Sequence, residues 1–139
     1  MIDMEVSNKN VIEWVLRIGV FLTFFGHGIV AIMGNPDWLK YIEVVGISNY
    51  NAQIILIFIG YLDFFVAFIT LLRPNKYILI WASIWAFSTA LIRPISGESI
   101  LEFIERGSNW ALPLGLYFYL KFLNNKRLQK KINTLSDHK

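Results

Sequence analysis

Residues 52–72 read AQIILIFIGYLDFFVAFITLL, and Asp63 is the one charged side chain in this run. An α-helix rises about 1.5 Å per residue, so roughly 20 apolar residues cross a hydrocarbon core that is about 30 Å thick. The run therefore predicts a membrane-spanning helix, and it sets the fold class expected for the rest of the chain.

The flanking sequence repeats this pattern. Residues 11–33 and 76–95 form apolar runs of similar length, and a shorter run at 109–123 contains Pro113, which the first turn of a helix tolerates. We predict a single all-α domain over residues 1–139, an integral membrane four-helix bundle. Its spans are expected at 11–33, 52–72, 76–95 and 109–123, followed by a basic tail at 124–139.

The composition argues against the alternative, a soluble domain with buried helices. Hydrophobic residues make up 55% of the 139 residues and charged residues 17%, whereas a soluble domain of this size needs polar groups over a proportionally large surface. The absence of cysteine excludes disulfides, thiolate catalysis and cysteine-ligated metal or iron–sulfur sites.

Positive charges are distributed unequally between the two ends of the predicted spans. Lys9, Arg73, Lys76 and the basic tail fall on one side, whereas Lys40 and Arg106 fall on the other. Because cytoplasmic loops carry an excess of Lys and Arg, we expect both termini to be cytoplasmic and the protein to lie in a bacterial cytoplasmic (inner) membrane. The tail is expected to contact anionic lipid and no nucleic acid.

The two predicted outer loops resemble each other, since residues 39–43 read LKYIE and residues 101–105 read LEFIE. A proline precedes each segment (Pro36, Pro94) and a glycine follows it (Gly46, Gly107), as at the two ends of a short helix. Each segment is expected to form a short amphipathic helix in the outer interface. The similarity indicates either two parallel copies of one unit or a chance match.

Small residues mark the faces on which the first two spans are expected to pack. They recur at helical spacing as Gly19, Thr23 and Gly26 in the first span and as Gly60, Ala67 and Thr70 in the second. Such residues let membrane helices approach closely, since lipid provides no hydrophobic drive for their association.

Four ionisable side chains lie within the spans or at their ends, where a charge costs about 3 kcal/mol or more: Arg17, His27, Asp63 and Arg93. Glu13 lies one turn before Arg17, so we expect a structural pair near the cytoplasmic interface. Asp63 must be protonated or paired, and Arg93 and Arg17 are its candidate partners. A structural ion pair and a functional acid both remain open for Asp63.

His27 is flanked by Gly26 and Gly28, which leave space around the imidazole for a ligand or a neighbouring backbone. Its ring would bond to another helix, act as a proton donor, or donate a hydrogen bond to a quinone or another polar headgroup. Ligation of haem or a metal is less favoured because the second histidine, His138, lies in the tail, and we expect no metal site.

A further polar group follows the second outer loop and consists of Glu105, Arg106, Asn109 and Trp110. An interfacial tryptophan usually anchors a span, but the group would equally suit a clamp for a polar headgroup. These four residues, with His27, Asp63 and Arg93, are the candidate ligand-binding residues.

Several landmarks resemble the DoxX-like membrane proteins. They are LRIG at 16–19, GHG at 26–28, the segment 36–41, and GYLD at 60–63 followed by Ala67. The resemblance covers residues 13–96. It departs from the family pattern at His27, where the family more often has lysine, and at 105–110, which has no counterpart. It implies a four-helix bundle in which Arg17 and Asp63 form the polar core and His27 lies near a headgroup. For some members it implies a small membrane subunit that helps a redox enzyme pass electrons to quinone.

We therefore expect a redox-associated subunit that binds a quinone-like or lipid-like molecule at the outer side of the bundle, around His27, Asp63 and Arg93. Its expected partners are the lipid bilayer and a membrane or periplasmic redox protein, and a homo-oligomer stays open. The alternatives are a non-catalytic assembly or scaffold subunit, and a small proton-coupled transporter with Asp63 as its coupling acid. No residue is assigned a catalytic role, and whether the protein is an enzyme stays open.

Overall fold

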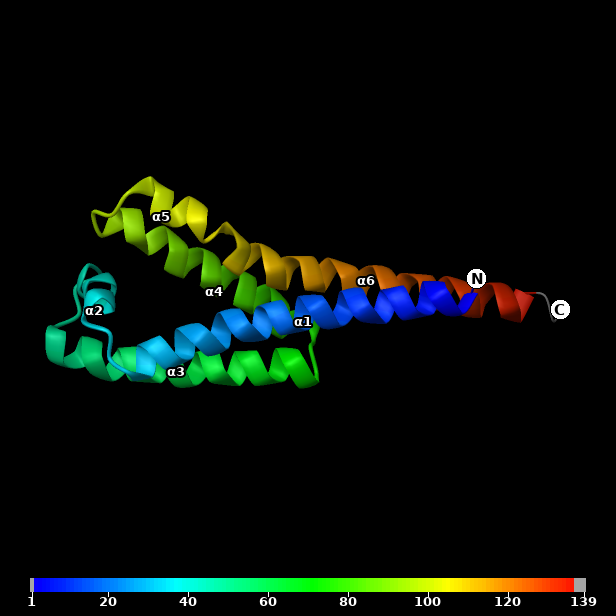
Figure 1. The fold of residues 1–139 in the computed structure, drawn as a ribbon, viewed down its shortest axis with the longest axis horizontal. Helices are drawn as coiled ribbons and strands as arrows, with labels where there is room; N and C mark the ends of the chain where they lie inside the picture. The colour runs from blue at the N-terminus through cyan, green and yellow to red at the C-terminus, as the bar shows by residue number, and fades with distance from the viewer. Residues whose placement is uncertain (1, 137–139) are drawn as a thin grey trace.

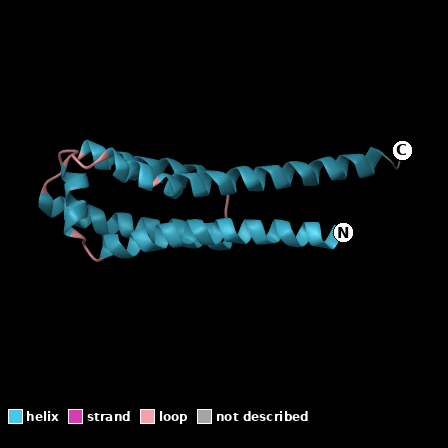
Figure 2. Cartoon of the chain, turned by 45° about the horizontal axis from the view of Figure 1, so that its top comes forward, coloured by secondary structure: helices cyan, strands magenta, loops and turns pink. Residues whose placement is uncertain are grey.

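The computed structural model describes the backbone of residues 2–136 and the side chains of residues 9–136. This part of the chain is helical and contains no β-strand (Figure 2), so the prediction of an all-α fold is confirmed. The helices are α1 (Ile2–Ile32), α2 (Pro36–Glu43), α3 (Asn49–Leu72), α4 (Lys76–Ile95), α5 (Ile100–Glu105) and α6 (Gly107–Ser136).

The four long helices form two antiparallel pairs, α1 with α3 and α4 with α6. The α1 helix also packs along α6, and this contact joins the pairs. Figure 1 shows the pairs diverging toward the end of the molecule that carries α2 and α5, with α2 between them. The elements at this end therefore surround the space between the pairs.

Three helical segments are long and apolar enough to cross a membrane: Lys9–Ile32, Asn49–Leu72 and Lys76–Ile95. They agree closely with the first three predicted spans. The fourth predicted span, 109–123, lies within α6 but does not reach the same length and hydropathy, because Asn124, Asn125 and Lys126 follow it directly. The helix nevertheless continues through most of the basic tail.

The α3 helix is apolar on the outside and polar on the inside. Phe58, Phe65 and Phe68 are exposed along one face. Asp63 and Thr70, in contrast, are buried, with 4% and 0% of their surfaces exposed. This distribution is the reverse of that on a surface helix of a soluble protein, and it is the arrangement that a hydrocarbon solvent favours.

The α1 and α3 helices cross in direct backbone contact at Gly28 and Gly60. A Cβ atom at Gly60 would lie 2.9 Å from the Gly28 carbonyl oxygen, and one at Gly28 would lie 2.9 Å from the Gly60 carbonyl oxygen. The predicted packing role of Gly60 is therefore confirmed. The same prediction for Gly26 is wrong: no described atom outside its own helix lies within 4 Å of a Cβ added there. The contact belongs to Gly28 because residues two apart lie on nearly opposite faces of a helix, and the face of α1 that carries Gly28 meets α3.

The two short helices differ, although their sequences are alike. Pro36 begins α2, the Asn35 side chain accepts a hydrogen bond from the Asp37 N–H, and Gly46 follows with φ +89°. These ends match the prediction. The apolar face of α2 does not turn outward to the interface, since Ile42 is buried against α1 and α3.

The second of the two similar segments, residues 101–105 in α5, departs from the predicted pattern. Pro94 lies inside α4, Ser99 caps α5 by accepting from the Leu101 N–H, and Gly107 begins α6. None of the residues of α5 is buried. The prediction of a proline start is wrong here, because Ser99 supplies the side-chain oxygen that starts the helix, whereas Gly107 does follow the C-cap residue Arg106 as predicted.

Candidate functional site

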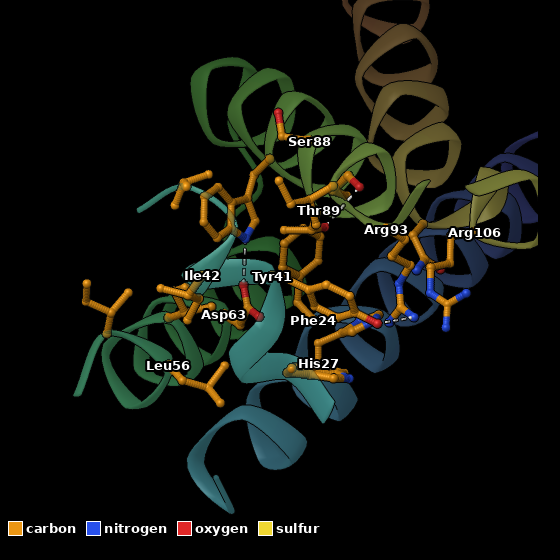
Figure 3. Close-up of a pocket in the computed structure, with 18 of the residues that line it drawn as sticks. Phe24, His27, Tyr41, Ile42, Leu56, Asp63, Ser88, Thr89, Arg93 and Arg106 are labelled. Atoms are coloured by element: carbon orange, nitrogen blue, oxygen red, sulfur yellow. Dashed lines mark hydrogen bonds between the residues drawn. The ribbon is translucent and has the colours of Figure 1, made fainter. Parts of the chain in front are cut away.

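A cavity of about 330 Å³ lies between the diverging helix pairs, beneath α2 (Figure 3). Residues of α1, α2, α3 and α4 line it, together with Arg106 and Asn109 near the start of α6. Most of its wall is apolar or aromatic, and it includes Phe24, Trp38, Ile59 and Trp85. Its volume falls at the lower end of the range for small-molecule sites, about 300–1,000 Å³.

Asp63 lies at the inner part of this cavity, and its partner is a tryptophan. Trp85 of α4 donates a hydrogen bond from Nε1 to Oδ1 of Asp63 at 3.2 Å (Figure 3). Among the ion pairs of residues 9–136, none includes Asp63. The predicted pairing with Arg93 or Arg17 is therefore wrong, because both arginines form ion pairs with glutamates of their own neighbourhoods.

His27 faces the same cavity from α1. Its Nδ1 lies 2.7 Å from the carbonyl oxygen of Thr23, and a carbonyl only accepts, so Nδ1 carries the proton of this bond. The ring centroid lies 5.7 Å from that of Trp38 on α2. In the neutral imidazole, Nε2 then keeps its lone pair and is an acceptor.

A polar network connects α2 to α4 and to the following loop. Arg93, with 8% of its surface exposed, donates from Nη1 to the Tyr41 hydroxyl at 2.9 Å and to Glu98 Oε2 at 3.2 Å. The Tyr41 hydroxyl donates to Glu98 Oε1 at 2.6 Å, and Lys40 Nζ lies 2.7 Å from the same oxygen. Figure 3 shows Tyr41 and Arg93 meeting beside the cavity.

This network shifts the titration of two of its members. The hydrogen bond from Lys40, followed by that from Tyr41, lowers the pKa of Glu98 from 4.5 to about 2. Burial, followed by the hydrogen bond to Glu98, raises the pKa of Tyr41 from 10 to about 12. Glu98 is therefore ionised and Tyr41 protonated at neutral pH, which are the states that their shared hydrogen bond requires.

The outer candidate residues divide into those at the cavity and those away from it. Arg106 lines the cavity and pairs through Nη1 with Glu102 at 2.6 Å, and Asn109 lines it one turn further along. Glu105 lies outside, with 73% of its side chain exposed. Trp110 packs its ring on Phe87, with 5.7 Å between centroids, away from the cavity. The structure therefore brings together His27, Asp63, Arg93, Arg106 and Asn109.

The predicted pair of Glu13 and Arg17 is confirmed at the other end of α1. Their side chains form an ion pair, and Arg17 Nη1 also donates to the carbonyl oxygen of Leu71 at 3.2 Å. The arginine thus ties α1 to the last turn of α3. Neither residue lines the cavity.

Sequence reasoning missed several cavity residues, above all Trp85 and Tyr41. Trp85 is far from Asp63 in the sequence, and only the contact between the helix pairs brings its N–H to the acid. Tyr41 resembled an ordinary interfacial aromatic residue. One sequence signal was available for Thr89, which lies one helical turn before Arg93 on the same face of α4.

The site contains no visible metal motif: within the described residues, no three His, Asp or Glu side chains lie close enough together to hold an ion. Comparisons of the chain with protein-family models, with curated proteins and with solved structures find no significant match. The fold and the site thus define an all-α protein with three helices capable of spanning a membrane and a mostly apolar cavity with a few polar groups in its wall.

Proposed function

We propose that this chain is a four-helix integral membrane protein that binds a small amphipathic molecule in the cavity between its helix pairs. The bound molecule is quinone-like or lipid-like, with an apolar body and a polar head. The cavity end of the bundle faces outward, and both termini face the cytoplasm of a bacterial inner membrane.

The membrane part of the proposal rests on the surface of the bundle. Large apolar side chains are exposed along α1, α3 and α4, and α6 packs between α4 and α1 as the fourth helix. The apolar part of α6 is short, but Lys121 and Lys126 are long enough to extend along the helix and reach the headgroups. The cations beyond Lys126 have no acidic neighbour in α6, which favours the cytoplasmic side for this end.

One observation carries the ligand-binding part: two polar groups with unused hydrogen-bonding capacity converge on an otherwise apolar cavity. His27 has Nε2 free of any hydrogen bond within the described residues, and Asp63 has a second oxygen beyond the one that Trp85 serves. Arg93, by contrast, is occupied by Tyr41 and Glu98. An apolar pocket with a few convergent polar groups is the usual form of a small-molecule site.

The redox association is a further step of this proposal, and it derives from the resemblance to the DoxX-like proteins. Under that hypothesis the ligand is a quinone, and the protein assists a membrane or periplasmic redox partner. A non-catalytic scaffold is the competing function. The bonds of Arg93 Nη1 with Tyr41 and Glu98 favour it, because such a network stabilises a bundle without any ligand.

The test fills the cavity while leaving His27 and Asp63 unchanged. Thr89→Phe would place an aromatic ring in the cavity, whereas Ile84→Phe would place the same ring on the exposed face of α4, where Ile84 is 62% exposed. Binding of a short-chain benzoquinone and of a short-chain phospholipid is followed in nanodiscs by tryptophan fluorescence, and co-purified molecules are identified by mass spectrometry. We expect binding to wild type and to Ile84→Phe but not to Thr89→Phe. Equal binding in all three proteins, or binding to none of them, would contradict the ligand site and favour the scaffold function.

A further inference from the structure

We infer that the polar head accepted by this cavity is a protonated amine, so that the ligand is a lipophilic organic ammonium ion. This inference rests on the proposed function, because it specifies the chemistry of the molecule bound at the same site. It follows from counting the hydrogen-bond donors and acceptors that the cavity wall presents.

The serine and threonine hydroxyl groups that line the cavity have no proton left for a ligand. Thr23 Oγ1 donates to the Gly19 carbonyl at 3.0 Å, and Thr89 Oγ1 donates to the Ala86 carbonyl at 3.0 Å. Ser88 likewise donates to a carbonyl of its own helix, at 2.9 Å. Each hydroxyl therefore offers the cavity only lone pairs.

The two nitrogen donors of this region are also occupied. The N–H of Trp85 is used by Asp63, and the Nδ1–H of His27 is used by the Thr23 carbonyl. What remains is Nε2 of His27 and the second carboxyl oxygen of Asp63. When Asp63 is ionised, the inner part of the cavity presents acceptors alone among the described residues, and a ligand must supply the donors.

Donor groups belong to the outer part of the cavity, where their charges are compensated. Arg93 and Arg106 line the cavity there, and Lys40, outside the lining, shares Glu98 with Arg93. The three carboxylates that pair with these cations are Glu98, Glu102 and Glu105. Opposite charges thus cancel within this cluster. Asp63 is left as the cavity-lining carboxyl that none of these cations neutralises.

The shape and nature of the wall fit a cation with an apolar body. Phe24, Trp38, Tyr41 and Trp85 all line the cavity, and the faces of aromatic rings attract cations. The carbonyl oxygens of a quinone, in contrast, would find one donor beside these acceptors, the proton of Asp63 in its acid form, and would leave no charge to pair with the carboxylate. An ammonium group has three donors and one positive charge, which matches the acceptors and the carboxylate.

Binding should also release a proton. An uncompensated carboxylate is costly in an apolar interior, so the empty site favours the protonated acid. When R–NH3⁺ enters, Asp63–COOH becomes Asp63–COO⁻ paired with the ammonium, and one H⁺ leaves to solvent. The other titratable groups that face this site are His27 from α1, Tyr41 from α2, Arg93 from α4, and Arg106 before α6.

The experiment uses the full chain in nanodiscs and three probes with the same octyl chain: octylamine, octanol and an octyl-substituted benzoquinone. Binding is followed by tryptophan fluorescence, and proton release by a pH-indicator dye in weakly buffered solution. We expect octylamine to bind at least about tenfold more tightly than octanol, the ratio that one hydrogen-bonded charge supplies. We also expect about one proton released per amine bound.

Variants assign this preference to Asp63. Asp63→Asn should lose the amine preference and the proton release, whereas Glu105→Gln, at an exposed carboxylate outside the cavity, should keep both. If octanol or the quinone binds wild type as well as the amine does, the ammonium inference fails and the proposed function stands. If no probe binds, or Thr89→Phe binds all of them unchanged, the proposed function fails. Proton release in wild type decides the inference even if Asp63→Asn does not fold.

Discussion

Replacing Gly60 by alanine is expected to destabilise the bundle by forcing α1 and α3 apart. The new Cβ would lie 2.9 Å from the Gly28 carbonyl oxygen and 2.6 Å from Cγ1 of Ile32. Carbon contacts are comfortable at about 3.5–4.0 Å, so the approach to the oxygen is short by about 0.6 Å. The Ile32 contact is at Cγ1, next to the Cβ of a β-branched side chain that is stiff at χ1, and the Gly28 carbonyl belongs to the α1 backbone and moves only with the helix.

Two opposing effects set the magnitude. Overpacking of this kind costs about 1–3 kcal/mol, whereas exchanging glycine for alanine within a helix gains about 1 kcal/mol. Gly26→Ala separates them, because the same exchange on the same pair of helices meets no described atom within 4 Å. We therefore expect Gly60→Ala to be less stable than Gly26→Ala by about 1–3 kcal/mol.

The measurement is the free energy of unfolding in mixed micelles, followed by circular dichroism as a denaturing detergent is added. Gly28→Ala should behave as Gly60→Ala does, since its Cβ meets the Gly60 carbonyl at the same 2.9 Å. The reasoning is refuted if Gly60→Ala and Gly28→Ala are as stable as Gly26→Ala, because the two backbones would then not be in contact.

Three further predictions concern the polar groups. Trp85→Phe removes the hydrogen-bond donor to Asp63 and should lower the free energy of unfolding by about 1–3 kcal/mol. Trp81→Phe, on the exposed face of α4, should lower it less, and equal losses would contradict the hydrogen bond between Trp85 and Asp63. Because the pKa of Glu98 is lowered, its contribution to stability is complete above about pH 4.5 and is lost as the pH falls through about 2. The free energy of unfolding, measured against pH, should therefore fall in this window for the wild type but not for Glu98→Gln. Because the pKa of Tyr41 is raised, its contribution to stability is complete below pH 10 and is lost as the pH rises through about 12. An ultraviolet titration should show one tyrosine that ionises late and that Tyr41→Phe removes; if the variant removes no such tyrosine, the prediction is contradicted.

The long helices could be predicted from the sequence because their signal is local. A run such as 52–72 must be helical wherever water is excluded, since each backbone group then finds its partner within four residues. The same locality explains why the pair of Glu13 and Arg17 was predictable: both residues lie on one helix, one turn apart. The fourth helix was predicted at 109–123, but its continuation to Ser136 was not, because the basic sequence after residue 123 has no apolar signal.

The partners of the buried polar groups could not be predicted in this way. Charge alone pointed from Asp63 to an arginine, but the actual donor is the neutral indole of Trp85. The choice depends on how the two helix pairs are rotated and spaced, and these quantities arise from packing between residues far apart in the sequence. The same reason explains why the spacing of small residues indicates Gly26 as a contact residue, although Gly28, two residues further on, is the one that meets α3.

The position of the helix crossing determines the position of the candidate site. The α1 and α3 helices are antiparallel, so His27, one residue before Gly28, and Asp63, three residues after Gly60, are displaced from the crossing in the same direction (Figure 1). At 1.5 Å per residue the displacements are about 1.5 and 4.5 Å, which places the two side chains within about 3 Å of each other in depth. Any substitution that separates the helices at the crossing therefore moves both polar groups of the cavity relative to each other. Gly60→Ala should weaken ligand binding more than Gly26→Ala does, because only the first change alters the distance between the two groups that the ligand must contact together.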